Sequence, residues 1–190
     1  MTDEWELLTA WRAGDAESGN TLVARHFPAI SRFFRGKLGD DVDDIIQQTF
    51  LACVEGRDRI SGCSFKGYLF GVATRRLYSH LRSVYKTNRV IDFSVSSLAA
   101  LGTTPSEGIA RNQRAQLLQK ALLQIPVDAQ ITLELAYWEG LSGAEIAVAL
   151  DIEVGTVRSR LSRARERLRE IVMSLGGDAS DLFGESPALP

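Results

Sequence analysis

The sequence predicts an all-α protein of two small helical domains joined by a flexible linker. Apolar residues recur at helical spacing through most of the chain, and the alternation of a half-buried strand is nearly absent. Between residues 91 and 111 the periodicity weakens and turn formers accumulate. The 190 residues are 45% apolar, enough for one ordinary domain or two small ones. We therefore expect domains over 1–90 and 112–175, a linker over 91–111 and a disordered tail over 176–190.

The first domain begins with helices delimited by turn residues. Gly14 is predicted to end the first helix, and Asp15 is a suitable N-cap for the second. Proline is well tolerated in a first helical turn, so Pro28 is expected to start a further helix that runs to Gly39.

Two more helices complete this domain. Asp40 or Asp41 is predicted to cap the first of them, and a polar loop over residues 55–64 follows. A long helix comes next, and its inward face is expected to hold Leu69, Ala73, Leu77, Leu81 and Val84.

The second domain contains the pattern of a helix-turn-helix. A helix that stops at Pro126 and a second one from an Asp128 cap to Gly140 come before it. Ser142 and Glu145 have the spacing of a capping box, and Asp151 stands where a left-handed turn residue is needed. The next helix has an apolar stripe of Val157, Leu161, Ala164, Leu168 and Ile171, with arginines on its other faces. This pattern indicates a recognition helix for the DNA major groove; the alternative is a solvated arginine-rich helix in a bundle.

Charge is segregated along the chain, although the pI of about 5.8 is unlike that of a protein that coats nucleic acid. Residues 65–90 carry six basic side chains and no acid, and residues 155–169 carry six arginines and one acid. Residues 38–58 are acidic, with six acids against one arginine. This segregation suggests two anion-binding surfaces and a different partner for the acidic segment.

Two helix faces are candidates for binding. One helix face is expected to carry four basic residues, Arg75, Arg82, Lys86 and Arg89, with Tyr78 and Ser79 beside them. This combination suits opened DNA; the alternative is a solvated basic face with Tyr78 in the core. The acidic helix start is either solvated or a docking face for another protein.

Other chemistry has little support in the sequence. No nucleophile, histidine pair or cysteine–histidine set has catalytic or metal-binding spacing, so we expect no enzyme activity, metal or cofactor. There is no secretory signal and no apolar run of about 20 residues, which predicts a cytoplasmic protein that does not insert into a membrane.

Four segments of the sequence make up three motifs that occur together in one family. They are residues 41–50 (DVDDIIQQTF), residues 65–76 (FKGYLFGVATRR), and residues 141–147 (LSGAEIA) with 154–165 (VGTVRSRLSRAR). In this order they resemble the polymerase-binding helix, the −10 helix and the −35-reading motif of the extracytoplasmic-function (ECF, group IV) sigma factors of the sigma-70 family. The resemblance implies that residues 1–90 form a region 2 helical bundle and residues 112–175 a region 4 helix-turn-helix.

The resemblance also implies partners. Region 2 would bind the clamp helices of the largest subunit of core RNA polymerase and melted −10 DNA. Region 4 would bind the −35 duplex and the flap of the other large subunit, and the family commonly has an anti-sigma factor. The implied polymerase contacts are Asp41, Asp44, Gln47, Gln48 and Phe50. The implied −10 contacts are Lys66, Tyr68, Arg75, Arg76, Tyr78, Ser79, Arg82 and Lys86. The implied −35 contacts are Thr156, Arg158, Ser159, Arg160, Ser162, Arg163 and Arg165.

Three positions depart from the family pattern. Arg75 stands where an Asn is frequent, Ser162 replaces a bulkier residue, and Asp151 replaces the turn glycine. These departures concern which promoter sequence the protein would prefer. A simple helix-turn-helix regulator is the alternative class, and it would occupy DNA without polymerase.

Overall fold

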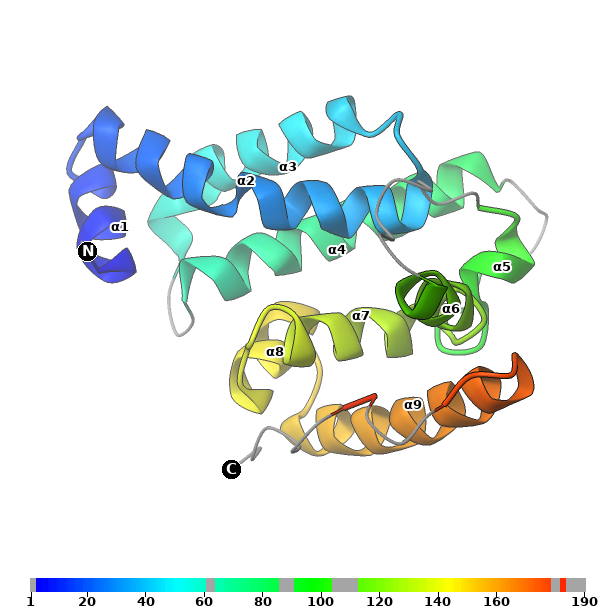
Figure 1. The fold of residues 1–190 in the computed structure, drawn as a ribbon. Coiled ribbons are helices and arrows are strands. Elements are labelled where there is room, and N and C mark those ends of the chain that lie inside the picture. The colour runs from blue at the N-terminus through cyan, green and yellow to red at the C-terminus, as the bar shows by residue number, and fades with distance from the viewer. Residues whose placement is uncertain (1–2, 61–63, 86–90, 104–112, 179–181, 184–190) are drawn as a thin grey trace.

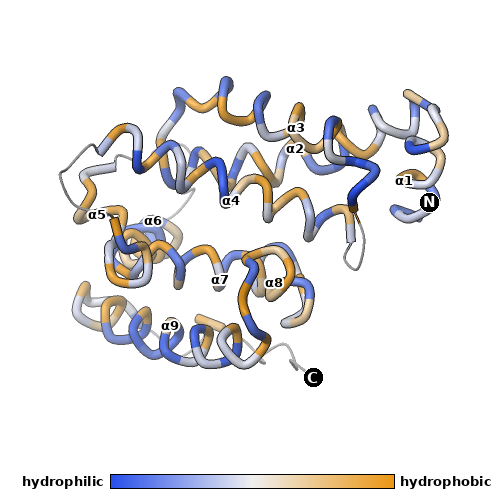
Figure 2. Tube along the Cα trace, turned by 180° about the vertical axis from the view of Figure 1, so that it is seen from behind, coloured by the Kyte–Doolittle hydropathy of each residue, from blue (hydrophilic) through white to orange (hydrophobic). Residues whose placement is uncertain are grey.

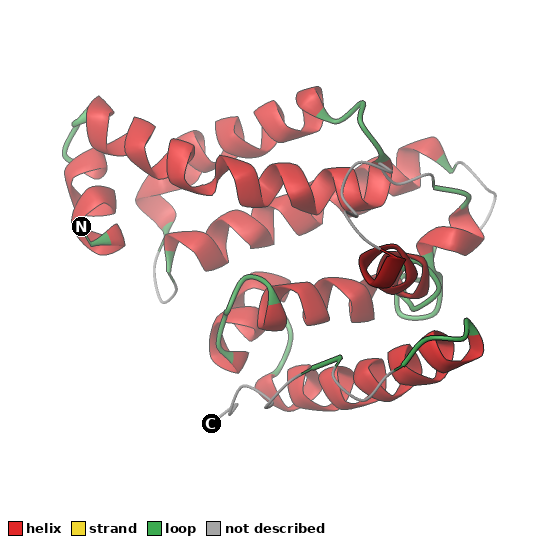
Figure 3. Ribbon diagram, viewed as in Figure 1, coloured by secondary structure: helices red, strands yellow, loops and turns green. Residues whose placement is uncertain are grey.

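The structure, a computed structural model, describes residues 3–60, 64–85, 91–103, 113–178 and 182–183. Within these ranges every regular element is a helix, as Figure 3 shows, apart from one isolated bridge between Ser97 and Pro126. The all-α prediction is therefore confirmed for the described residues.

Four helices and one short 3-10 turn form the first half of the molecule. They are α1 (Glu4–Arg12), α2 (Ala16–Leu38), α3 (Asp43–Gly56), η1 (Arg57–Arg59) and α4 (Phe65–Val84). The three long helices run side by side, and α1 folds back at one end of them (Figure 1).

The second half lies against α4. Its helices are α5 (Leu98–Leu101), α6 (Gln113–Leu122), α7 (Val127–Tyr137), α8 (Gly143–Leu150) and α9 (Val154–Ser174). In Figure 1, α7 and α8 form the layer next to α4, and α9 lies on their far side. The expected domain boundaries stay a prediction. The two halves are docked on each other in this structure, so it does not show where one domain ends and the other begins.

One hydrophobic core runs through both halves. Apolar and polar residues alternate along the helices in Figure 2, and the buried cluster extends from α1 to α9. The predicted inward stripe of α4 is correct at Leu69, Ala73, Leu77 and Leu81, which are fully buried. It is wrong at Val84, which is 56% exposed because the helix ends there and extends past its neighbours.

Pro28 does not start a helix, contrary to the prediction, and instead lies inside α2. A proline inside a helix removes one backbone hydrogen bond and costs about 3 kcal/mol. Leu22 and Ile30 on either side of it are fully buried. Burial of both flanking turns against the same core therefore keeps α2 continuous.

The predicted caps are partly correct. Asp15 accepts a hydrogen bond from the backbone N–H of Glu17 at 3.1 Å, as expected. The other two predicted caps are wrong by one or two residues. The N-cap of α3 is Val42 and that of α7 is Pro126, and neither makes a side-chain cap hydrogen bond. Asp128 is consequently inside the first turn of α7, where its carboxylate faces other elements.

The helix-turn-helix forms as predicted. The hydroxyl of Ser142 accepts from the N–H of Glu145 at 3.3 Å, and the Ser142 N–H donates to the Glu145 carboxylate at 2.9 Å. Asp151 ends α8 with φ of 55°, the left-handed conformation that the turn requires. The apolar stripe of α9 is buried from Val157 to Ile171.

The described part of the predicted flexible linker, residues 91–103, is packed on the second half. Phe93 and Leu98 are buried, and the N–H of Asp128 donates to the Phe93 carbonyl at 3.2 Å. The turn formers suggested a flexible chain, but two apolar side chains hold this part in place. In the predicted tail, Phe183 packs on Tyr137 with ring centroids 5.0 Å apart.

An ion pair connects α1 to α2. The Glu4 carboxylate lies 2.6 Å from His26 Nε2, and its other oxygen accepts from the Lys66 N–H at 3.5 Å. Burial raises the pKa of Glu4, but the hydrogen bond and charge of His26 outweigh burial and hold this pKa below its ordinary value.

We expect Glu4→Gln to lower the free energy of unfolding by about 1 kcal/mol at neutral pH. Because the folded-state pKa is depressed, the contribution of Glu4 is present above its unfolded pKa and is lost as the pH falls through the folded value. Urea unfolding from pH 7 downward should show the two proteins converging in acid. Glu166→Gln, at an exposed position on α9, is the control. A constant difference across the pH range would contradict the assignment.

Candidate nucleic-acid and polymerase interfaces

The exposed face of α4 carries most of the residues expected at the −10 element. Arg75, Arg76, Ser79 and Arg82 are exposed. The first three, with Tyr68, line an open cavity of about 340 Å³. Guanidinium groups beside an aromatic ring can bind backbone phosphates and stack on bases. Of the other expected contacts, Lys86 is outside the described residues.

Tyr78 is a half-buried member of the same set. Its ring stacks on Phe93 with centroids 4.4 Å apart, and its hydroxyl donates to Asp128 Oδ1 at 2.5 Å. Burial and then the hydrogen bond to Asp128 raise the pKa of Tyr78, so this hydroxyl stays protonated as a donor. The packed ring and the engaged hydroxyl agree with the alternative that places Tyr78 in the core, and binding of opened DNA by this face stays a prediction.

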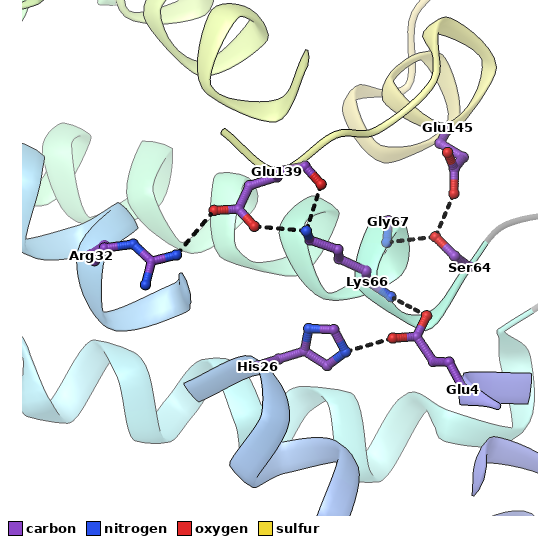
Figure 4. Close-up of polar contacts among 8 residues, drawn as sticks. All are labelled: Glu4, His26, Arg32, Ser64, Lys66, Gly67, Glu139 and Glu145. Carbon is purple, nitrogen blue, oxygen red and sulfur yellow. Dashed lines mark hydrogen bonds and ion pairs between the residues drawn. The ribbon is translucent and has the colours of Figure 1, made fainter. Parts of the chain in front are cut away.

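Lys66 is engaged as well. Its ammonium donates to the Glu139 backbone carbonyl at 2.5 Å and lies 2.8 Å from the Glu139 carboxylate, which Arg32 approaches from the other side at 3.6 Å (Figure 4). Lys66 is thus partly neutralised by a residue of the second half.

The start of α3 is an exposed acidic and amide surface. Asp41, Asp44, Gln47 and Gln48 are all exposed. Phe50 is different: it is 8% exposed and stacks on Phe27 with ring centroids 6.1 Å apart. The motif placed Phe50 among the contact residues, but a side chain this buried positions α3 from within.

The first turns of α9 form the second basic surface. Arg158, Ser159, Ser162 and Arg163 are exposed, and Thr156 is partly so. Two arginines of the expected set contact the protein instead: Arg160 lies 3.2 Å from the Asp128 carboxylate, and Arg165 donates to the Tyr137 hydroxyl at 3.2 Å.

Comparison with known families gives two matches, in chain order. The model for "Sigma-70 region 2" matches residues 22–87, and that for "Sigma-70, region 4" matches residues 115–168. The chain belongs to the sigma-70 family. It is a promoter-recognising factor for transcription initiation, and the sequence-based prediction of an ECF sigma factor is confirmed.

Relatives of this sigma factor match over nearly their whole length. The ECF RNA polymerase sigma-E factor of Escherichia coli K12 is 27% identical over 187 residues, covering 92% of this chain and 96% of its own. The sigma-E factor of Haemophilus influenzae is 25% identical over 185 residues, with 92% and 97% coverage.

Two solved structures have a similar fold. CnrH, solved in complex with the cytosolic domain of CnrY, superposes with a TM-score of 0.65 at 23% identity, covering 90% of this chain and 97% of its own. The sigma factor RpoE of Bartonella quintana, solved in complex with the anti-sigma factor NepR, gives 0.61 at 25% identity, with 81% and 96% coverage.

The sequence reasoning missed the acids that region 4 of this sigma factor presents to region 2. Asp128, Glu134, Glu139 and Glu145 each contact a side chain of the first half or its predicted DNA surface. They are scattered over 18 residues and form no charge run, so only the folding of α7, α8 and the segment between them brings these acids together.

The described residues offer little for other chemistry. Among them, no group of three or more His, Cys, Asp or Glu side chains is arranged to hold a metal ion. None of the helices in the described ranges has both the length and the apolarity of a membrane span.

Proposed function

We propose that this sigma factor divides promoter recognition between its two basic helix surfaces and docks on polymerase through α3. Region 2 binds the clamp helices of the largest polymerase subunit through Asp41, Asp44, Gln47 and Gln48. It binds melted −10 DNA through the exposed face of α4. Region 4 places the start of α9 in the −35 major groove and contacts the flap of the other large subunit. The protein acts in the cytoplasm and catalyses no reaction of its own.

One observation carries this proposal. Each of the two matched regions presents a solvent-exposed basic helix face, and the start of α3 presents an exposed acidic one. Basic faces attract the DNA backbone, and an acidic face fits a basic protein partner. Run-off transcription with core polymerase over a genomic promoter library is the test. Promoter-specific transcripts that require the factor are expected. Binding to DNA sites without polymerase and no transcripts with it would instead support a simple regulator.

The arginines of α9 are expected to contribute to DNA binding in two different ways, by reading a base or by binding phosphate. Arg163, in the third turn of α9, is expected to read a base, so Arg163→Ala should cost about 1–3 kcal/mol and relax preference at one −35 position. Arg169 lies further along, with its guanidinium 5.4 Å from the Phe183 ring. Its replacement by Ala should weaken all sequences alike and lower the salt slope by about one unit. A −35 promoter library transcribed with both variants separates these effects, and an unchanged sequence preference in Arg163→Ala would refute base reading.

We also propose an anti-sigma partner. The support is the structural neighbour RpoE, which was solved in complex with the anti-sigma factor NepR. A protein of this kind should block run-off transcription when added before core polymerase and have less effect when added afterwards.

A further inference from the structure

The end of α9 turns the chain back toward the arginines of that helix. Gly176 has a φ of 80°, in the left-handed region that glycine adopts without steric cost. Its N–H donates to the Met173 carbonyl at 3.0 Å, and the N–H of Gly177 donates to the Val172 carbonyl at 2.9 Å. These two hydrogen bonds form a Schellman motif, which ends a helix and redirects the chain. A Cβ at Gly177 would lie 2.7 Å from a Leu117 methyl carbon, so both glycines are needed for the reversal.

The reversal brings one aromatic side chain of the tail, Phe183, onto region 4. Its ring packs on the Tyr137 ring of α7 with centroids 5.0 Å apart, and the Arg169 guanidinium carbon lies 5.4 Å from its centroid. Leu182 and Phe183 are both partly buried against the hydrophobic core, and Figure 1 shows them in red beside α9. Phe183 lies outside residues 115–168, which match the region 4 model, so the matched segment does not include this contact.

The Phe183 ring lies on a side of α9 that also carries expected −35 contacts. Four residues of α9 follow the spacing i, i+4, i+7 and i+11 and therefore share one side of the helix: Arg158, Ser162, Arg165 and Arg169. Phe183 contacts Arg169 of this set, and Tyr137 accepts a hydrogen bond from Arg165 at 3.2 Å. Two aromatic residues that pack on each other therefore each contact one arginine of this side.

Arg169 remains accessible in this arrangement. The residue is exposed, although the Phe183 ring lies beside its guanidinium. A guanidinium above an aromatic ring gains cation–π attraction and keeps its N–H donors, which bind phosphate oxygens in pairs. An arginine side chain has many rotamers, so holding it before DNA arrives reduces the entropy that is lost on binding.

We propose that Phe183 is a positioning residue of region 4, whose ring holds the Arg169 guanidinium for a phosphate of the −35 duplex. This inference rests on the proposed function and extends it to the tail. Tyr137 supports the arrangement from the other side, since it packs on Phe183 and holds Arg165.

The acidic residues of the tail suggest the opposite effect as the alternative. Asp178, Asp181 and Glu185 lie on both sides of Phe183 in the sequence, and carboxylates near α9 repel phosphate. A tail that covers α9 would lower the affinity for DNA, whereas a ring that positions Arg169 raises it. The exposure of Arg169 favours positioning, and the sign of the effect of Phe183→Ala separates the two.

The first measurement tests the contact in the free factor. A single para-fluorophenylalanine at position 183 gives one fluorine resonance, which is sensitive to the ring current of Tyr137. Tyr137→Leu should move this resonance toward its position in the urea-unfolded chain. Tyr68→Leu, on α4, is the control and should leave the resonance where it is in the wild type.

The second measurement is the affinity of the holoenzyme, the factor with core polymerase, for a promoter found by run-off transcription. Phe183→Ala should weaken binding about two- to fivefold for every −35 sequence and lower the salt slope by up to about one unit. Phe183→Tyr keeps the ring and should bind like the wild type. Phe183→Leu keeps an apolar side chain without an aromatic face, so it should bind like Phe183→Ala. A purely structural anchor would tolerate leucine.

A double-mutant cycle shows whether Phe183 acts through Arg169. In an Arg169→Ala background, Phe183→Ala should cause no further loss of affinity, because the arginine that it positions is absent. Arg167→Ala is the matched control on the same helix, since Arg167 pairs with Glu170 at 3.0 Å. The losses from Arg167→Ala and Phe183→Ala should add.

Each outcome bears on a stated claim. Higher affinity in Phe183→Ala would show that the tail covers α9, and equal affinity would show that the ring has no part in binding; either result overturns the proposal. Additive losses from Phe183→Ala and Arg169→Ala also overturn it. A fluorine resonance that is unchanged in Tyr137→Leu would refute the contact itself. Failure of the wild-type holoenzyme to transcribe would contradict the proposed function and this role of Phe183, while the fluorine measurement still decides whether the contact exists.

Discussion

Replacing Glu134 by Ala is expected to open the interface between the two regions. Glu134 on α7 pairs with Lys37 on α2, and the Lys37 side chain has no exposed surface. The ammonium also donates to the Phe33 carbonyl at 3.0 Å and lies 3.8 Å from the Phe33 ring, and the charge of Glu139 acts on it less strongly than that of Glu134. Burial lowers the pKa of Lys37, and the charge of Glu134 opposes this effect.

Removing one partner of a buried ion pair costs about 3–5 kcal/mol while the remaining charge stays buried. Separation of the regions returns Lys37 to water and relieves this penalty. Loss of the Glu134 carboxylate should therefore shift the equilibrium from docked toward separated regions by about a hundredfold or more. Each region should remain folded.

The distance between spin labels on α3 and α9, together with hydrogen exchange in α4 and α8, measures this shift. The double variant Lys37→Met/Glu134→Leu, which removes both charges, should restore docking. Glu170→Ala is the control for an exposed pair, since Glu170 and Arg167 are 57% and 61% exposed at 3.0 Å and contribute at most about 1 kcal/mol. Wild-type label distances in Glu134→Ala would contradict the role of this pair.

Reversing the charge of the acidic surface should abolish most of the affinity for core polymerase. Asp41 and Asp44 are exposed, so Asp41→Lys/Asp44→Lys removes no buried contact of the free factor. Like charges brought together in an interface cost several kcal/mol, so binding should weaken by more than about tenfold. The fold should survive, with a loss of about 1 kcal/mol from a lysine near the helix N-terminus.

Pull-down and titration with core polymerase test this expectation. Glu55→Lys/Asp58→Lys makes the same change in net charge at the other end of the acidic segment and is the matched control. Equal binding by both double variants would show that α3 does not dock through its start.

The sequence by itself determined the features that depend on neighbours three or four residues apart. The Ser142–Glu145 capping box, the left-handed Asp151 and the buried stripe of α9 all formed as predicted, because each depends on local backbone geometry. The three sigma-factor motifs were identifiable for the same reason, since each is a short contiguous segment.

Tertiary structure decided what depends on contacts between distant residues. Pro28 could be placed inside α2 only once the packing of both flanking turns was known, and the burial of Phe50 depends on Phe27 of another helix. The pairing of Lys37 with Glu134 joins residues 97 positions apart. Helical periodicity shows which face of a helix is apolar, but it does not show which other face will cover it. The docking of region 4 on region 2 therefore follows only from the three-dimensional match of their charges and shapes.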